Sequence, residues 1–124
     1  QCVVVSIDVC DGEVVTKCGQ QLTGRYPVEW VREVEDRGAG EILLTSVDRD
    51  GMMGGYNIEL IRAVVDETSI PIVACGGAGG LEHFADALRA GAHAVAAASV
   101  FHFTEITPMM VKKHLDEQGF PVRL

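Results

Sequence analysis

The chain has 124 residues, of which 48% are hydrophobic and 23% charged, a composition typical of one globular domain spanning residues 1–124. Its formal net charge of −8 argues against non-specific binding to nucleic acid or to an anionic membrane, because both need a basic surface. An anionic small ligand remains compatible with this charge, since backbone N–H groups bind phosphate without any net positive charge.

Four short apolar runs rich in β-branched residues predict strands. Each is a continuous apolar block, which is typical of strands buried on both faces of a parallel sheet. In chain order they are Cys2–Ile7, Glu41–Val47, Ile70–Ala74 and Ala94–Ala98. The segment from Val9 to Tyr26 is too long for an ordinary βα loop, and its letters EVVTKCGQQLTG indicate a small hairpin.

An amphipathic stretch of helical length follows each strand. Pro27 suits a first helical position and Gly38 a helix end, while Asn57 and Thr107 suit N-caps. The four stretches are 27–38, 57–68, 81–91 and 107–119. The strand–helix order, repeated four times with right-handed crossovers, predicts an α/β fold of four parallel βα units.

Four βα units are compatible with two architectures. One is a small open sheet with helices alternating between its faces. The other is half of a TIM (β/α)8 barrel, whose usual length of ~250 residues is about twice that of this chain. The order of elements leaves both open, but in each of them ligands bind at the carboxyl ends of the parallel strands.

The first two strand ends carry candidate site residues. Asp8 directly follows an apolar run, so we expect a partly desolvated carboxylate, and it is the best candidate for a general acid or base. An ordinary loop or helix-cap aspartate is the alternative. The second strand leads into TSVDRDG, where Thr45, Ser46, Asp50 and Gly51 are candidates for a ligand-facing loop, although Asp-Gly is also a common turn dipeptide.

The third and fourth strand ends fit a phosphate cradle. Gly76 and Gly77 precede a helix, and a glycine-rich turn lets backbone N–H groups approach phosphate oxygens closely. One βα unit later, Ala98 and Ser99 open what the sequence indicates to be a short helical turn, and barrels often place a phosphate site at such a pair of ends. The alternative is that the glycines only allow a tight strand-to-helix turn.

No pattern indicates a metal or another cofactor. The cysteines Cys2, Cys10, Cys18 and Cys75 form no C-x-x-C pair, and the four histidines share no spacing suited to a metal. We therefore expect free thiols in a reducing cytoplasm and no cofactor. The sequence also contains no apolar run of ~18 residues and no stretch that resembles a signal peptide.

Four motifs in order carry a resemblance to a known family: RGAGEILLTSVDRDG, GGYNIELIRAV, IPIVACGGAGGLEHF and AGAHAVAAASVFHF. They closely resemble the C-terminal half of the cyclase subunit of imidazole glycerol phosphate synthase, and the resemblance covers nearly the whole chain. A sister enzyme, the phosphoribosyl-formimino isomerase of histidine biosynthesis, shares the RDG and glycine motifs. The wording AASVFHF resembles the cyclase instead.

The resemblance implies half of a cytoplasmic (β/α)8 barrel that, when whole, partners a glutaminase subunit. The whole cyclase is a lyase of histidine biosynthesis. It converts phosphoribulosyl-formimino-aminoimidazole carboxamide ribotide and ammonia into imidazole glycerol phosphate and aminoimidazole carboxamide ribotide. By the same resemblance Asp8 is one of two catalytic aspartates. The residues implied to line the site and hold one substrate phosphate are Asp50, Gly51, Gly77, Ala98 and Ser99.

The resemblance also implies what this half lacks: the first four strands, the other catalytic aspartate and the second phosphate site. After Asp8 the chain reads VCDG where the family commonly shows AKRVDG, and Cys75 stands where the family usually has serine. We therefore expect little or no activity from this half alone, weak or no binding of the glutaminase, and a homodimer or higher oligomer that completes the barrel. The alternative is a non-catalytic, self-assembling half-barrel that binds phosphorylated ligands.

Overall fold

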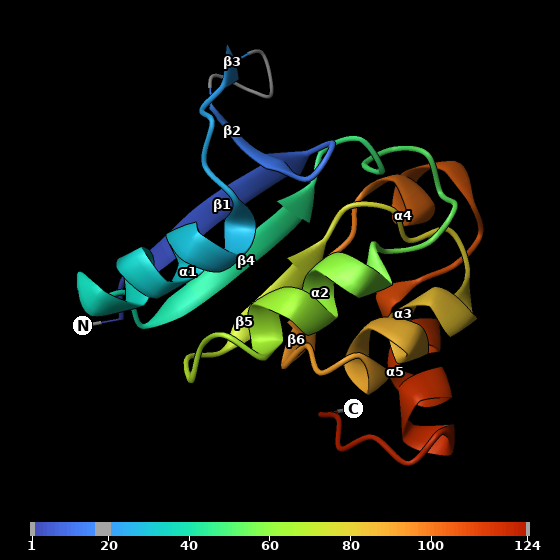
Figure 1. Cartoon of the computed structure of the whole chain (residues 1–124). Helices are drawn as coiled ribbons and strands as arrows, with labels where there is room; N and C mark the ends of the chain where they lie inside the picture. Colours follow the sequence, from blue (N-terminus) through green and yellow to red (C-terminus); the bar gives the residue numbers. More distant parts are fainter. Residues whose placement is uncertain (1, 17–20, 124) are drawn as a thin grey trace.

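The computed structural model describes residues 2–16 and 21–123, and its centre is a mixed six-stranded sheet in the order β3-β2-β1-β4-β5-β6 (Figure 1). The parallel strands are β1 (Val4–Cys10), β4 (Glu41–Ser46), β5 (Ile72–Cys75) and β6 (Ala94–Val95). The antiparallel strands are β2 (Glu13–Thr16) and β3 (Gln21–Leu22). The predicted parallel βα order and the predicted hairpin are confirmed; Cys18 lies outside the described residues.

The helices follow the strands as the sequence predicts. They are α1 (Pro27–Asp36), α2 (Ile58–Val65), α3 (Leu81–Arg89), α4 (Ser99–Phe103) and α5 (Pro108–Glu117). Both predicted N-caps form, because the Asn57 side chain accepts from the Leu60 amide and the Thr107 side chain from the Met110 amide. Over residues 2–16 and 21–123, no helix combines the length and the apolar character needed to cross a membrane.

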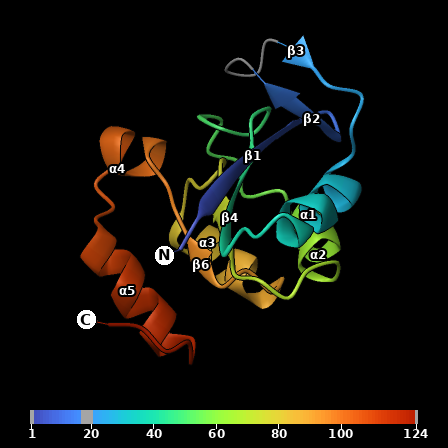
Figure 2. The ribbon, with the colours of Figure 1, turned by 90° about the vertical axis from the view of Figure 1, so that its left-hand side faces the viewer.

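The helices α1, α2 and α3 cover one face of the parallel strands (Figure 1). Each parallel strand pairs with the one before it in the chain, and right-handed crossovers in one direction place successive helices on the same face. Figure 2 shows α1 and α2 on one side of β1 and α4 and α5 on the other, so the layer of helices curves around the sheet. This arrangement excludes the open sheet with helices on alternating faces.

The hydrophobic core lies between the sheet and these helices. Side chains alternate along each strand, and those on the helix-facing side are buried: Ile7, Val9, Ile42, Leu44 and Ile72. The intervening positions, such as Asp8 and Thr45, are only half-buried. The prediction of strands buried on both faces is therefore wrong for the described residues, because nothing in them covers the second face.

All four parallel strands depart from their predicted bounds by one to three residues, and the largest shifts are at the ends of β1 and β6. Strand β1 continues past Asp8 to Cys10, because the hairpin strand β2 pairs with Asp8, Val9 and Cys10. Strand β6 is limited to Ala94–Val95, since within the described residues it pairs only with β5. Asp8 therefore lies inside a strand and not in the loop after it.

Candidate functional site

A row of three polar side chains crosses the face of the sheet that the helices leave uncovered. In the strand register Asp8 is the partner of Thr45, and Thr45 is the partner of Cys75. All three alternate with buried helix-facing residues, so their side chains share the uncovered face. The Ser6 hydroxyl lies two positions earlier on β1 and donates to Asp8 Oδ1 at 3.3 Å. We call Asp8, Thr45 and Cys75 the polar row.

Cys75 holds its proton in this setting. Burial raises the pKa of the Cys75 thiol, and the carboxylates of Asp50 and Asp8 raise it further. Hydrogen bonds with the Thr45 side chain and the Gly76 amide act in the opposite direction without reversing the shift. The thiol is thus a neutral neighbour of the two carboxylates at neutral pH and not an activated nucleophile.

The glycine loop, which we define as residues 76–80, follows the polar row and packs directly on the loop between β4 and α2. A Cβ on Gly76 would lie 2.6 Å from the Ser46 carbonyl oxygen, and one on Gly77 would collide with the Gly55 carbonyl oxygen. The Gly55 amide donates to the Gly77 carbonyl at 2.7 Å. Gly76 and Gly77 also have φ values of 93° and 120°, which side chains oppose, so both positions need glycine.

Two buried residues of the glycine loop have amides without a hydrogen-bond partner among the described residues. Gly77 and Ala78 are buried, yet neither amide donates to another group within residues 2–16 and 21–123. Buried backbone donors without partners are rare, and an anion is one way to satisfy them. The next amide, that of Gly79, is already bound to the ring of His83 at 3.0 Å.

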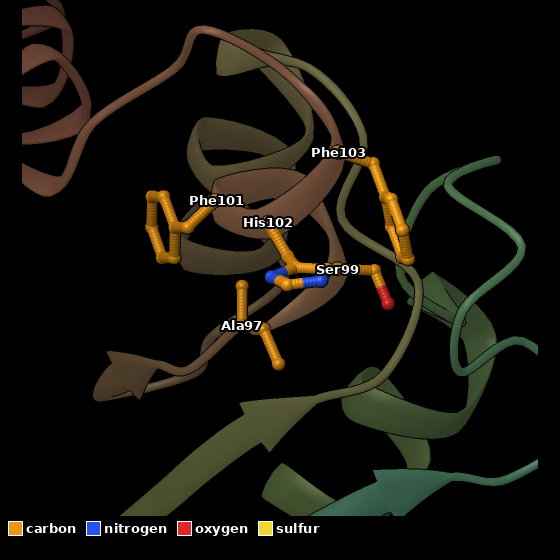
Figure 3. Close-up of a pocket in the computed structure, with 6 residues that line it drawn as sticks. Ala97, Ser99, Phe101, His102 and Phe103 are labelled. Atoms are coloured by element: carbon orange, nitrogen blue, oxygen red, sulfur yellow. The ribbon is translucent and has the colours of Figure 1, made fainter.

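The fourth strand end approaches the second. Gly51 lies beside Ser99, such that a Cβ on Gly51 would be 3.8 Å from Ser99 Oγ. Ala98 is the N-cap of α4, and Ser99 is its first residue. Figure 3 shows Ser99 and Phe103 pointing to one side of α4 and Phe101 to the other. An open hollow lies against this turn, lined by Ala97, Ala98, Ser99, Phe101, His102 and Phe103.

Not every candidate side chain reaches this edge. Ser46 is 3% exposed and lies on the helix-facing side of β4, where its hydroxyl donates to Asp48 Oδ1 at 2.9 Å. Its carbonyl oxygen instead accepts from the amides of Arg49 and Asp50, at 3.2 and 2.9 Å. Ser46 therefore shapes the turn that carries Asp50, and its hydroxyl does not join the polar row.

Two residues that the motifs did not single out hold the strand ends together. The Tyr56 hydroxyl donates to the Ala96 carbonyl at 2.8 Å, and its ring meets the edge of Phe84. Burial raises the pKa of Tyr56, so this hydroxyl remains a donor. Arg49 Nη1 donates to the Tyr56 carbonyl at 3.2 Å. The sequence did contain a signal for Tyr56, because a large aromatic residue between two glycines and the N-cap Asn57 indicates a buried anchor for the loop.

The polar groups of the described residues at this edge are carboxylate and hydroxyl oxygens, a thiol and backbone N–H groups. Within them, no three His, Cys, Asp or Glu side chains are grouped so as to hold a metal ion. Cys2, Cys10 and Cys75 carry free thiols. What converges at the carboxyl ends of the strands is a carboxylate, a hydroxyl, a neutral thiol and unpaired amides, which suits proton transfer next to a bound oxyanion.

Comparisons with known proteins identify relatives of this chain. A family described as "Histidine biosynthesis protein" matches residues 1–107. The chain is 52% identical over 128 residues to imidazole glycerol phosphate synthase subunit HisF of Pyrobaculum aerophilum, covering 100% of this chain and 51% of that protein. It is 56% identical over 111 residues to the subunit HisF of Thermobifida fusca, covering 90% and 43%. It is 55% identical over 128 residues to the subunit HisF of Thermotoga sp. strain RQ2, covering 100% of this chain and 51% of that protein. The chain spans about half the length of the curated relatives it matches.

Proposed function

The chain belongs to the histidine biosynthesis protein family, and from this premise we propose that it forms the C-terminal half of a cyclase site of the imidazole glycerol phosphate synthase type. The reaction joins ammonia to phosphoribulosyl-formimino-aminoimidazole carboxamide ribotide. Its products are imidazole glycerol phosphate and aminoimidazole carboxamide ribotide. The observation that carries the proposal is the polar row, with Asp8 in register beside Thr45 and next to the glycine loop.

Asp8 is the general acid–base group of this half in our proposal. It is half-buried and lies on the uncovered face, where a substrate can reach it. Proton transfer by a positioned side chain accelerates such reactions by roughly 10²–10⁴-fold. The polar row contains one carboxylate, and the cyclisation needs proton transfers on two sides of the substrate. We therefore propose that Asp8 works only together with groups from the other half of a barrel.

The phosphate of the ribotide is held at the other strand ends. In our proposal the amides of Gly77 and Ala78 bind the phosphate from one side, and Ser99 with the Ala98 N-cap binds it from the other; the absence of other partners for these amides among the described residues supports this. Gly51 keeps the β4–α2 loop close to Ser99 without a side chain in the way. In our proposal Thr45 and Asp50 lie between this cradle and Asp8. Gly76 packs against the Ser46 backbone and so holds the glycine loop in place.

The fold that serves this function is half of a (β/α)8 barrel. The curvature of the helix layer, the strand order and the uncovered face of the sheet support it. We propose that a second copy of the chain covers this face in the absence of the other half. The proposed setting is the cytoplasm. A glutaminase subunit would meet only half of its docking surface, so a pull-down with such a subunit is expected to recover little of it.

The test combines the chain with the half of a related cyclase subunit that the chain does not match. The chain is mixed with the part of the Pyrobaculum aerophilum subunit HisF outside the matched region, and turnover of the ribotide is measured at high ammonium concentration. The mixture is expected to be active and the chain alone to have little or no activity. The Asp8→Asn variant should lower kcat of the mixture at least about 100-fold. The control, Asp11→Asn, changes an exposed carboxylate that lies beyond the strand end.

A second candidate function is a non-catalytic half-barrel that binds phosphorylated ligands, favoured by the single carboxylate of the polar row. Phosphate binding without turnover in any mixture would support it. Full activity of the Asp8→Asn mixture would contradict the catalytic role of Asp8. Isomerisation of the upstream aminoaldose ribotide by the mixture would point to the sister isomerase instead.

A further inference from the structure

His83 folds back from helix α3 onto the glycine loop that precedes it. It is the third residue of α3, it is half-buried, and its Nδ1 accepts a hydrogen bond from the Gly79 amide at 3.0 Å. A backbone N–H can only donate, so Nδ1 carries no proton in this contact. The neutral ring therefore holds its proton on Nε2.

The same ring also lies beside the neighbouring loop. A Cβ on Gly55 would lie 3.5 Å from both Cδ2 and Nε2 of His83, so the ring lies beside Gly55 with about the space of one methyl group between them. Gly55 is the residue whose amide donates to the Gly77 carbonyl at 2.7 Å. His83 thus bonds to the glycine loop through the Gly79 amide and lies beside Gly55 of the β4–α2 loop.

The glycine loop has little of its own to fix its shape. Four of its five residues are glycines, which lose the most conformational freedom on folding, and Ala78 carries only a methyl group. Its conformation must therefore be held by groups outside it. Among the groups that hold it are the Gly55 amide on the Gly77 carbonyl, the His83 amide on the Gly80 carbonyl and the His83 ring on the Gly79 amide.

We propose that His83 is a positioning residue for the anion site. Its ring accepts the hydrogen bond of the Gly79 amide and so fixes the conformation of the glycine loop. In this conformation the two preceding amides, of Gly77 and Ala78, bind the ligand. The proposal deepens the proposed function, on which it rests for the identity of the ligand as a phosphate. His83 itself does not touch the phosphate; it acts through the backbone of the loop.

The chain provides a matched control in His93. Its Nδ1 also accepts a backbone amide, that of Ile72 at 3.1 Å, but this contact lies at the opposite end of β5. Loss of either ring removes the same kind of hydrogen bond. Only loss of His83 is expected to change the glycine loop.

The experiment titrates the full chain with inorganic phosphate and follows the amide signals of Gly77 and Ala78 by NMR. The variants are His83→Leu, His83→Asn, His83→Gln and His93→Leu. His83→Leu is expected to weaken phosphate binding about tenfold, the effect of one lost hydrogen bond at the site. His83→Asn, whose carbonyl oxygen takes the place of Nδ1, should restore binding to within about threefold. His83→Gln should not restore it, and His93→Leu should leave phosphate binding unchanged.

Hydrogen exchange of the Gly79 amide tests, without any ligand, whether the His83 ring holds the glycine loop. It is expected to quicken at least about tenfold in His83→Leu and to slow again in His83→Asn, and the ¹⁵N shift of Nδ1 should be that of an unprotonated nitrogen. Equal exchange in the wild type and His83→Leu, or equal phosphate affinity in the two, would overturn the proposal. If the wild type binds no phosphate while Gly79 exchange follows His83 as expected, the phosphate site fails and the positioning role stands.

Discussion

Glu35 shows how much one side chain contributes far from the candidate site. Its Oε1 accepts from the Thr68 hydroxyl at 2.8 Å, the Ser69 amide at 2.9 Å and the Ser69 hydroxyl at 2.8 Å. These bonds tie the end of α1 to the turn that precedes β5. They lower the pKa of Glu35 below its ordinary value of 4.5, with the Thr68 hydroxyl contributing most, because each donor stabilises the carboxylate.

This lowered pKa predicts a pH-dependent effect of Glu35→Gln. A group whose pKa falls on folding stabilises the protein fully above its unfolded-state pKa, here about 4.5, and this contribution is lost as the pH falls through the folded-state pKa. The variant should therefore be less stable than the wild type at pH 7, and the gap should shrink below about pH 4.5. Urea unfolding at several pH values measures it. Asp36→Asn, at an exposed neighbouring carboxylate, should show no such trend.

At the scale of elements, the glycine loop and the β4–α2 loop form one unit through backbone contacts. Gly77→Ala should lower the free energy of unfolding by at least about 2 kcal/mol, because the new Cβ meets the Gly55 carbonyl and φ is 120°. Gly54→Ala is the control, since a Cβ there would meet nothing within 4 Å, and it should change stability by less than about 0.5 kcal/mol. Chemical denaturation of both variants compares them; equal losses would show that the two loops are not interlocked.

Local signals predicted the elements well, and contacts between distant segments set the rest. The signals that begin a helix act within one turn of the chain. They are a proline at the first helical position and the N-caps Asn57 and Thr107, so the sequence alone indicates where these helices begin. The end of β1 depends on its pairing with β2, which no local pattern specifies.

The same distinction holds for the candidate site. Side-chain alternation predicts that Asp8, Thr45 and Cys75 share one face of the sheet, whereas the register that aligns them is set by the backbone pairing of the folded strands. The hydrogen bond from Tyr56 to Ala96 joins residues 40 apart, and the one from the Gly55 amide to the Gly77 carbonyl joins two different βα units. Such contacts become visible only once the loops are folded against each other.

At the scale of the whole molecule, the uncovered face and two partly open strand edges dominate. Val3 and Val4, at the start of β1, are 55% and 54% exposed. The neighbouring strand β2 leaves this start of β1 unpaired, because it pairs with β1 only from Asp8 to Cys10. An apolar groove beside β6 is lined by Val95, Phe101 and Val111, among others. Exposed apolar strands of this kind favour association.

Sedimentation tests the self-association that we propose. The chain is expected to sediment with a mass of at least twice 13.3 kDa at micromolar concentration. Val4→Lys, which puts a charge on the exposed start of β1, should shift the population toward the monomer, whereas Ala63→Lys on the exposed face of α2 should not. A well-folded wild-type monomer would count decisively against a completed barrel.

The strand order has a consequence for how the chain folds as it is made. Because each parallel strand pairs with the parallel strand before it, each later βα unit finds its docking surface already in place when it leaves the ribosome. The parallel strands are then added in one direction, and the two-residue strand β6 joins last. An arrest of translation before this final step would leave a nascent intermediate that carries Asp8, Thr45 and Cys75 in register but has not yet gained Ser99.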